Sequence, residues 1–481
     1  MVLGGVLALL IAHVFGKSTR TDAFFAAYGV YSVALVLGQT FRLAALPRLV
    51  ADADGRSATR LLASVGLLAL IAAVPMVALA DPIGTLLVER DPDEVAAAAL
   101  RALWPATVGQ LLAAMLAAAL AIRGRFVVIG VGYVIAGVAS IVLFVALEQP
   151  LGIQAVPVAL VGSGALLASL FATALLRTGW RPRAAQLRPA GVAGEAVRLV
   201  AASAIFLAAN VGYIICVAVA SRAGSGEATI YAYAYLSAAL LVGATASSFA
   251  MVRSPKLLSA ASSATRSAAH ALTSYRFTLV LVLPSLALAA VAGPAILDVL
   301  LGGAFDRDDA RRLVIALFCL SGWLLGSAGA VYAIVELLNQ RRLAALAIVA
   351  AAQTAALLPL AILGRELAGI AGIALAQSSV MLAATGALTA LAFESGARDV
   401  LIRLGQSTAL AVLALAGSLV PGVGVLIVFG DSTRPSLVAA AVTIGALAIA
   451  LRAIWPDEVG VLLSVVRRSA EPSAEARNAD C

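Results

Sequence analysis

Long apolar runs, separated by short charged or Gly- and Pro-containing segments, follow one another along the whole chain. Most of them approach the ~20 residues that an α-helix needs to cross a bilayer. They do not show the alternation over ~10 residues that marks a transmembrane β-strand. The pattern predicts an all-α polytopic membrane protein. The candidate spans number fourteen: 2–15, 24–47, 59–80, 95–121, 126–147, 152–176, 197–220, 229–252, 269–292, 312–337, 343–363, 369–393, 404–428 and 435–455.

Composition excludes an ordinary soluble globule. Hydrophobic residues make up 62% and charged residues 12% of the chain, against about 25% charged in soluble domains. The net charge of +8 does not indicate a nucleic-acid partner, because the basic residues lie in short clusters between apolar runs without interleaved aromatics.

The basic residues predict the orientation in the membrane. If both termini are cytoplasmic, the inner loops carry 22 of the 33 lysines and arginines and the outer loops nine. Because inner loops of membrane proteins are enriched in basic residues, we expect a multi-pass protein of the bacterial cytoplasmic membrane with N-in, C-in topology. The first span is short, so either it begins at the membrane edge or the native start lies upstream of Met1.

Catalytic and metal-binding patterns are missing from the sequence. Of the three cysteines, Cys216 and Cys319 sit inside apolar runs and Cys481 is the last residue, which gives no disulfide framework or metal spacing. No span carries paired carboxylates, and the chain has no Walker loop and no Ser/His/Asp set. We expect a protein that is not an enzyme, with no metal and no cofactor.

An internal repeat appears when the chain is shifted by 205 residues. "AYGVYSVALVLGQT" (27–40) then lies over "AYAYLSAALLVGAT" (232–245), with seven of fourteen positions identical, and Lys17 and Asp22 lie over Arg222 and Glu227. The matches fall in the second and eighth spans, so the period is six helices. Chance similarity between alanine-rich spans is the alternative.

Six is an even number, so the two halves would share one orientation, as in transporters with parallel repeats. We expect two six-helix lobes around a central cavity, joined by a polar linker and followed by two additional helices and a tail. The expected parts are 1–176, 177–198, 199–395, 396–455 and 456–481.

Polar residues inside the spans are candidates for lining that cavity, because charge at bilayer depth is costly. Arg42 lies near the inner end of its span, with Gln39 and Thr40 on neighbouring turns. It either contacts an anionic headgroup or extends to the inner phosphates as an anchor. Arg101 is a cavity candidate or an interfacial anchor.

Other polar residues offer similar alternatives. Glu336 is a candidate for ion coupling, or a capping or loop partner of Arg341 or Arg342. Asn210 binds a ligand or forms an interhelical hydrogen bond. Tyr235, with Tyr231 and Tyr233, stacks on sugar rings or belongs to an interfacial aromatic belt. Gln110 and Gln377 complete the predicted cavity lining.

A family resemblance rests on the stretch "AHVFGKSTRTDAFFAAY" (12–28) and the downstream "LPRLVAD" (46–52). It resembles the A-R-x-F-G, short loop, D-A-F-F-x-A-[FY] pattern, followed by V-P, of the MurJ/MviN lipid II flippase family. That family belongs to the multidrug/oligosaccharidyl-lipid/polysaccharide exporter superfamily. The resemblance implies alternating access that moves a polyprenyl-pyrophosphate-linked saccharide to the outer leaflet, powered by membrane potential or an ion gradient.

The chain departs from that family where arginines would be expected to grip the pyrophosphate. Leu7 and Ala8 replace an arginine and an aspartate, "VALV" (33–36) replaces L-L-R-R, and "YAYL" (233–236) replaces Y-A-D-R-L. The sequence therefore predicts a divergent member, with Arg42 as the first candidate for the headgroup contact.

Three functions remain open at the level of sequence. The leading one is a flippase for lipid II or a related lipid-linked saccharide, with that substrate, membrane lipids and cell-wall synthesis proteins as partners. The second is a cation-coupled multidrug antiporter that depends on Glu336. The third is a non-transporting scaffold of an envelope-synthesis complex.

Overall fold

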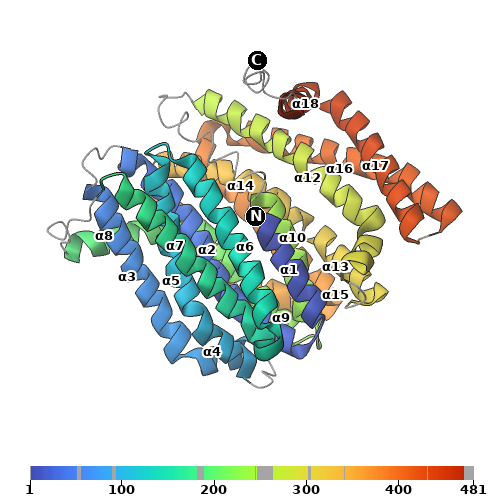
Figure 1. Ribbon diagram of the computed structural model, residues 1–481. Helices are drawn as coiled ribbons and strands as arrows, with labels where there is room; N and C mark the ends of the chain where they lie inside the picture. The colour runs from blue at the N-terminus through green and yellow to red at the C-terminus, as the bar shows by residue number, and fades with distance from the viewer. Residues whose placement is uncertain are drawn as a thin grey trace, which may run out of the picture.

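The computed structural model describes residues 2–50, 56–88, 94–180, 189–243, 245, 264–301, 305–340, 342–430 and 432–470. Within these ranges the regular elements are all helices, and long helices packed side by side form the body of the molecule (Figure 1). The prediction of an all-α polytopic fold is confirmed.

The first six predicted spans correspond to six long helices, together called the N-terminal set. A short helix, α4 (Ala80–Leu87), follows the third of them, and a 3-10 turn, η2 (Gly152–Gln154), precedes the last. The six are α1 (Val2–Phe15), α2 (Thr19–Val50), α3 (Arg56–Ala78), α5 (Val95–Ala121), α6 (Phe126–Leu151) and α7 (Ala155–Arg177).

The next six predicted spans form the C-terminal set. It comprises α8 (Pro189–Ala202), α9 (Ala204–Ala220), α10 (Glu227–Val242), α12 (Ala264–Leu301), α13 (Arg307–Cys319), α14 (Ser321–Asn339), α15 (Leu343–Phe393) and the 3-10 turn η5 (Glu394–Gly396). The last two spans are α16 (Ala397–Phe429) and α17 (Thr433–Ile454), and α18 (Pro456–Ala470) follows them. In Figure 1, α16 and α17 lie with α12 at one side of the molecule.

Breaks in the helices reconcile these elements with the predicted count. By length and composition, eight continuous helical stretches of the described chain can cross a membrane, or nine if the pair α8 and α9, bent by 64°, is one span. Two of the stretches hold two predicted spans each: α6 with α7, and α15, whose backbone kinks at Ala368 and Gly369. Gly369 has φ 58°, a conformation that glycine adopts without steric cost. With α1, α2 and α10, the helices agree with about fourteen spans.

Two of the expected parts contain helices that the sequence pattern did not predict. The linker 177–198 is helical from Pro189 onward, and the tail 456–481 begins with α18. In α18, Pro456 occupies the first position, where a missing N–H costs nothing, and Asp457 and Glu458 fill the first turn, where acidic groups favour the helix dipole. Residues 181–188 and 471–481 lie outside the described ranges.

Glycines permit close helix crossings within each set. A Cβ on Gly109 of α5 would lie 2.9 Å from the carbonyl carbon of Gly164 in α7, and one on Gly372 would lie 1.9 Å from the carbonyl oxygen of Gly364 within α15. Small residues at such crossings let helices associate in a membrane, where burial of apolar surface provides little drive.

Candidate functional site

A polar cluster joins the turn between α1 and α2 to the start of α10, and we call it the latch. Asp22, in the first turn of α2, is 2% exposed. One carboxylate oxygen accepts a hydrogen bond from the Gly226 backbone N–H at 2.6 Å. The other accepts from the Thr229 N–H at 2.7 Å and the Thr229 hydroxyl at 2.5 Å. Asp22 therefore caps the N-terminus of a helix in the other set, where N–H groups lack helical partners and favour an anion.

Ion pairs surround this cap. Lys17 Nζ lies 2.7 Å from Asp309 Oδ1 at the start of α13, and only 7% of the Asp309 side chain is exposed. Glu227, the residue that the repeat aligns with Asp22, pairs with Arg312 of α13. A hydrogen bond of 3.1 Å joins the hydroxyls of Thr19 and Ser225. The charged residues between the first two spans thus hold the two helix sets together.

The contacts of the repeat-aligned residues are reciprocal. Lys17 extends from the N-terminal set to α13, whereas Arg222 extends from the C-terminal set to α4, donating to the Leu86 carbonyl at 2.7 Å. The hydroxyl of Ser221 donates to the Leu87 carbonyl at 3.1 Å. Each turn therefore contacts the opposite helix set, and both contacts lie on the same face of the molecule.

Burial sets the electrostatics of Asp22. Desolvation raises the pKa of its carboxyl above the ordinary value, and the hydrogen bonds from Thr229 and Gly226 act in the opposite direction. Burial disfavours the ionised carboxylate and the three hydrogen-bond donors favour it. These hydrogen bonds therefore stabilise the ionised form of Asp22 in its buried position.

An aromatic seam continues inward from the latch. The ring centroids of Phe25 in α2 and Tyr233 in α10 are 4.9 Å apart, edge to face. Gly29 of α2 provides the close approach beside them, since a Cβ there would lie 3.1 Å from both the Tyr213 ring and Ile214 of α9. This geometry closes the junction of the two sets.

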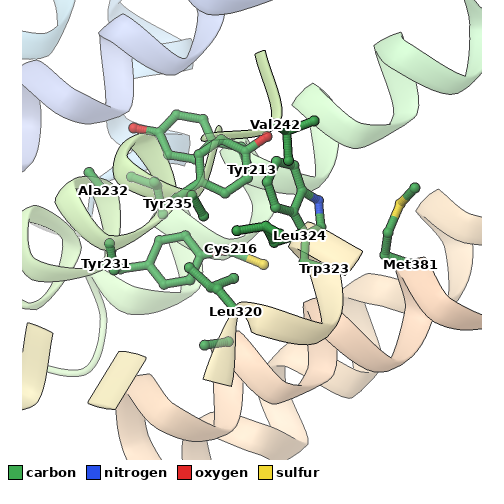
Figure 2. Close-up of a cluster of buried hydrophobic side chains, with 14 of the residues drawn as sticks. Tyr213, Cys216, Tyr231, Ala232, Tyr235, Val242, Leu320, Trp323, Leu324 and Met381 are labelled. Carbon is green, nitrogen blue, oxygen red and sulfur yellow. The ribbon is translucent and has the colours of Figure 1, made fainter. Parts of the chain in front are cut away.

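The C-terminal side of the seam is a stack of buried rings (Figure 2). Tyr213 and Tyr235 stack with centroids 4.5 Å apart, and Trp323 of α14 lies 4.7 Å from Tyr235. Tyr231 lies 6.5 Å from both Tyr213 and Tyr235. All four are buried, so the tyrosines of α10 lie in the protein interior. The interpretation of Tyr231, Tyr233 and Tyr235 as an interfacial belt was wrong, because all three side chains are buried within the protein.

Four of the cavity candidates contact residues of the seam or its neighbours on α2 and α10. Asn210 accepts a hydrogen bond of 3.2 Å from Ser32 of α2, an interhelical bond that joins the two sets. Gln377 of α15 accepts one from the Tyr231 hydroxyl. Gln110 of α5 is hydrogen-bonded to Tyr31. The bond of Asn210 thus crosses between the two sets, whereas those of Gln377 and Gln110 each lie within one set.

Three other candidates lie further along α2. Gln39, Thr40 and Arg42 belong to this helix by their backbone, and their side chains lie outside what the structure describes. Their proposed contact with an anionic headgroup stays a prediction.

The last two candidates lie elsewhere. Arg101 donates to both carboxylate oxygens of Asp81 in α4 at 2.6 Å, and 43% of its side chain is exposed. Glu336 accepts a hydrogen bond of 3.1 Å from Gln340 at the end of α14. The expected loop partner Arg342 pairs with Glu394 at 2.7 Å. Arg341 is not among the described residues.

The structure adds residues that the sequence pattern did not select. Ser32, Tyr213 and Trp323 occupy the seam, and nothing in their local sequence separates them from ordinary packing residues. Asp22 was recognised as part of a charged turn, and the repeat that aligned it with Glu227 was the available signal for its contact with α10.

Comparisons with known proteins agree with this architecture. The family model described as lipid II flippase MurJ matches residues 11–430. Among curated protein sequences, none matches the chain.

Three solved structures share the fold. A lipid II flippase MurJ in an inward closed conformation superposes with a TM-score of 0.68 at 17% identity, covering 95% of this chain and 97% of that chain. An inward-facing multidrug resistance MATE family transporter of the MOP superfamily gives 0.61 at 16% identity, covering 83% and 94%. A MATE transporter of Vibrio cholerae gives 0.51 at 15% identity, covering 82% and 94%.

Proposed function

The chain belongs to the MurJ lipid II flippase family, and on that premise we propose that it moves a polyprenyl-diphosphate-linked cell-envelope saccharide across the cytoplasmic membrane. Lipid II or a related lipid-linked oligosaccharide is the substrate. The protein acts as a transporter and not as a catalyst, with both termini in the cytoplasm.

The observation that supports this proposal most directly is the capping of α10 by Asp22 from α2. In our proposal the N-terminal and C-terminal sets are two lobes around a cavity. The latch and the seam close the cavity on the outer side, because Lys17, Arg222 and Arg312 lie on the face that the charge bias assigns to the outside. Alternating access then requires these contacts to break when the substrate leaves.

The residues of the junction suit such a cycle. The cap consists of hydrogen bonds to one carboxylate, so it breaks as a unit and leaves groups that water can solvate. The Tyr213 ring lies against Gly29 of the opposite lobe and stacks on Tyr235, and both rings would face the opened cavity, where aromatic faces stack on sugar rings. A membrane potential or an ion gradient supplies the energy, and neighbouring cell-wall synthesis proteins supply or take up the substrate.

The MATE-like fold keeps a cation-coupled antiporter as the second candidate. The family match over residues 11–430 favours the flippase. Transport of a cationic drug that depends on Glu336 would favour the antiporter instead.

Depletion of the protein in living cells tests the proposal. We expect lipid-linked precursor to accumulate on the inner leaflet, where an impermeant label added outside does not reach it, and re-expression of the wild-type chain to reverse this. A chain with the double substitution T19C/S225C, oxidised to lock the latch, should fail to rescue until reductant is added. Unchanged precursor distribution on depletion would contradict the proposal.

A further inference from the structure

A cavity of about 330 Å³ lies between α12, α13, α16 and α17, apart from the junction of the two sets. Its volume falls in the range of about 300–1,000 Å³ that ligand sites occupy. Ala290, Val291 and Pro294 of α12 form its apolar wall, and Leu426 of α16 lines it from the other side. The cavity thus lies where the C-terminal set meets the two additional helices.

A close helix crossing shapes the cavity on one side. Gly293 of α12 lies against Val314 of α13, and a Cβ on Gly293 would lie 2.7 Å from a Val314 methyl carbon. Val314 also lines the cavity. This side of the cavity, where α12 crosses α13, is therefore tightly packed. The cavity results from the way in which the helices pack.

Three charged residues line the same space. Arg307 and Arg311 stand one turn apart on α13, and Asp298 stands near the end of α12. The hydroxyls of Thr433 and Ser436 at the start of α17 complete the polar side. Two guanidinium groups suit a phosphate, because their planar donors match its oxygens. The carboxylate of Asp298 beside them suits an ammonium group at about the same depth in the cavity.

The surroundings place this cavity at the edge of the bilayer. Leu426 is followed on α16 by Ile427, Val428 and Phe429, which are 79%, 72% and 69% exposed and so form an apolar surface of the protein. The start of α13 lies on the latch face, because its Asp309 binds Lys17. An apolar surface next to paired charges is the environment in which a lipid headgroup meets its acyl chains.

We propose that this cavity binds one zwitterionic phospholipid of the leaflet on the latch face. Its phosphate contacts Arg307 and Arg311, its ammonium group contacts Asp298, and its acyl chains leave along Ile427 and Phe429. The cavity is large enough for a headgroup and the first part of the chains. The lipid would join α16 and α17 to α12 and α13, and the site does not depend on the proposed function.

Native mass spectrometry of the full chain in detergent tests this site, with phosphatidylethanolamine and phosphatidylglycerol added in equal amounts. We expect one phosphatidylethanolamine to stay bound to the wild type. The double variant R307Q/R311Q should retain it at least tenfold less. The matched control R434Q removes an arginine next to Thr433 that does not line the cavity, and it should bind as the wild type does.

A second variant separates headgroup recognition from folding. D298N removes the partner of the ammonium group at an exposed position, and it should change the preference from phosphatidylethanolamine toward phosphatidylglycerol. Equal retention by R307Q/R311Q and wild type would overturn the proposal, and so would an unchanged lipid preference in D298N. Preferential binding of a polyprenyl phosphate at the same residues would also overturn it.

Discussion

Asp22 at the start of α2 accepts hydrogen bonds from both the backbone N–H and the hydroxyl of Thr229 at the start of α10, 207 positions further along the chain. Two helices that the shift of 205 residues aligns are thus joined at their N-termini, and one of them supplies the cap of the other.

Replacing Asp22 tests whether this cap holds the junction closed. D22N removes the charge from the N-terminus of α10, and a hydrogen bond to a charged group contributes about 1.5–3 kcal/mol. We expect roughly tenfold or greater loss of the closed state. The yield of oxidative cross-linking in a T19C/S225C background measures the population of the closed state. D81N, at an exposed aspartate of α4, is the control and should leave the yield unchanged.

The hydroxyls of Thr19 and Ser225 are 3.1 Å apart across the junction, so cysteines at these positions are close enough to pair. We expect T19C/S225C to form a disulfide under oxidation and to stop transport, with recovery after reduction. Either single substitution should have no such effect. Full transport by the oxidised double variant would show that the junction need not open there.

The ion pair between Lys17 and Asp309 predicts a charge-swap result. K17D and D309K alone each place two like charges together and should shift the equilibrium away from closure by about 1 kcal/mol, a roughly fivefold change. The double variant K17D/D309K restores opposite charges and should recover most of the cross-linking yield. If the double variant were no better than the worse single one, the pair would not act in closure.

Gly29 allows α2 to approach α9. G29L should prevent closure, because its first carbon already lies 3.1 Å from Tyr213 and Ile214. Transport and cross-linking should fall while far-ultraviolet circular dichroism still reports full helix content. The matched control is G66L in α3, where an added Cβ has no neighbour within 4 Å. Similar losses in both variants would point to a general effect of leucine.

Gly372 tests packing rather than gating. G372A would put a Cβ 1.9 Å from the Gly364 carbonyl oxygen, and overpacking of this kind costs about 1–3 kcal/mol. We expect a lower thermal unfolding temperature in detergent. G386A lies in the same helix with no neighbour within 4 Å, so it should leave that temperature unchanged or raise it slightly.

The span pattern was predictable from sequence because membrane helices carry their own signal. The run 95–121 coincides with α5, and 126–147 and 152–176 agree closely with α6 and α7. A helix needs about 20 apolar residues to cross the bilayer, so such runs can be recognised without tertiary information. The bend between α8 and α9 was not predictable, because no proline or glycine marks Ser203.

The site was predictable only in part. Asn210 and Gln377 stand out in the sequence as polar residues in apolar spans, and the structure brings Asn210 to the junction and Gln377 to Tyr231 of the ring stack. Arg101 stands out for the same reason, yet it pairs with Asp81 on the exposed α4. A single span does not reveal which neighbour its polar residue meets. The position of the α10 tyrosines was predicted wrongly, because tyrosines of an interfacial belt and tyrosines of a buried stack give the same sequence pattern.

Two polar groups in the seam bear on how firmly the junction stays shut. The Tyr213 hydroxyl and the Trp323 indole N–H are buried without a hydrogen-bond partner, and each such group costs about 1–3 kcal/mol. Water that enters on opening would satisfy both, whereas the latch loses its bonds in the same step. These two unsatisfied groups therefore lower the stability of the closed state, so that a modest driving force is enough to open it.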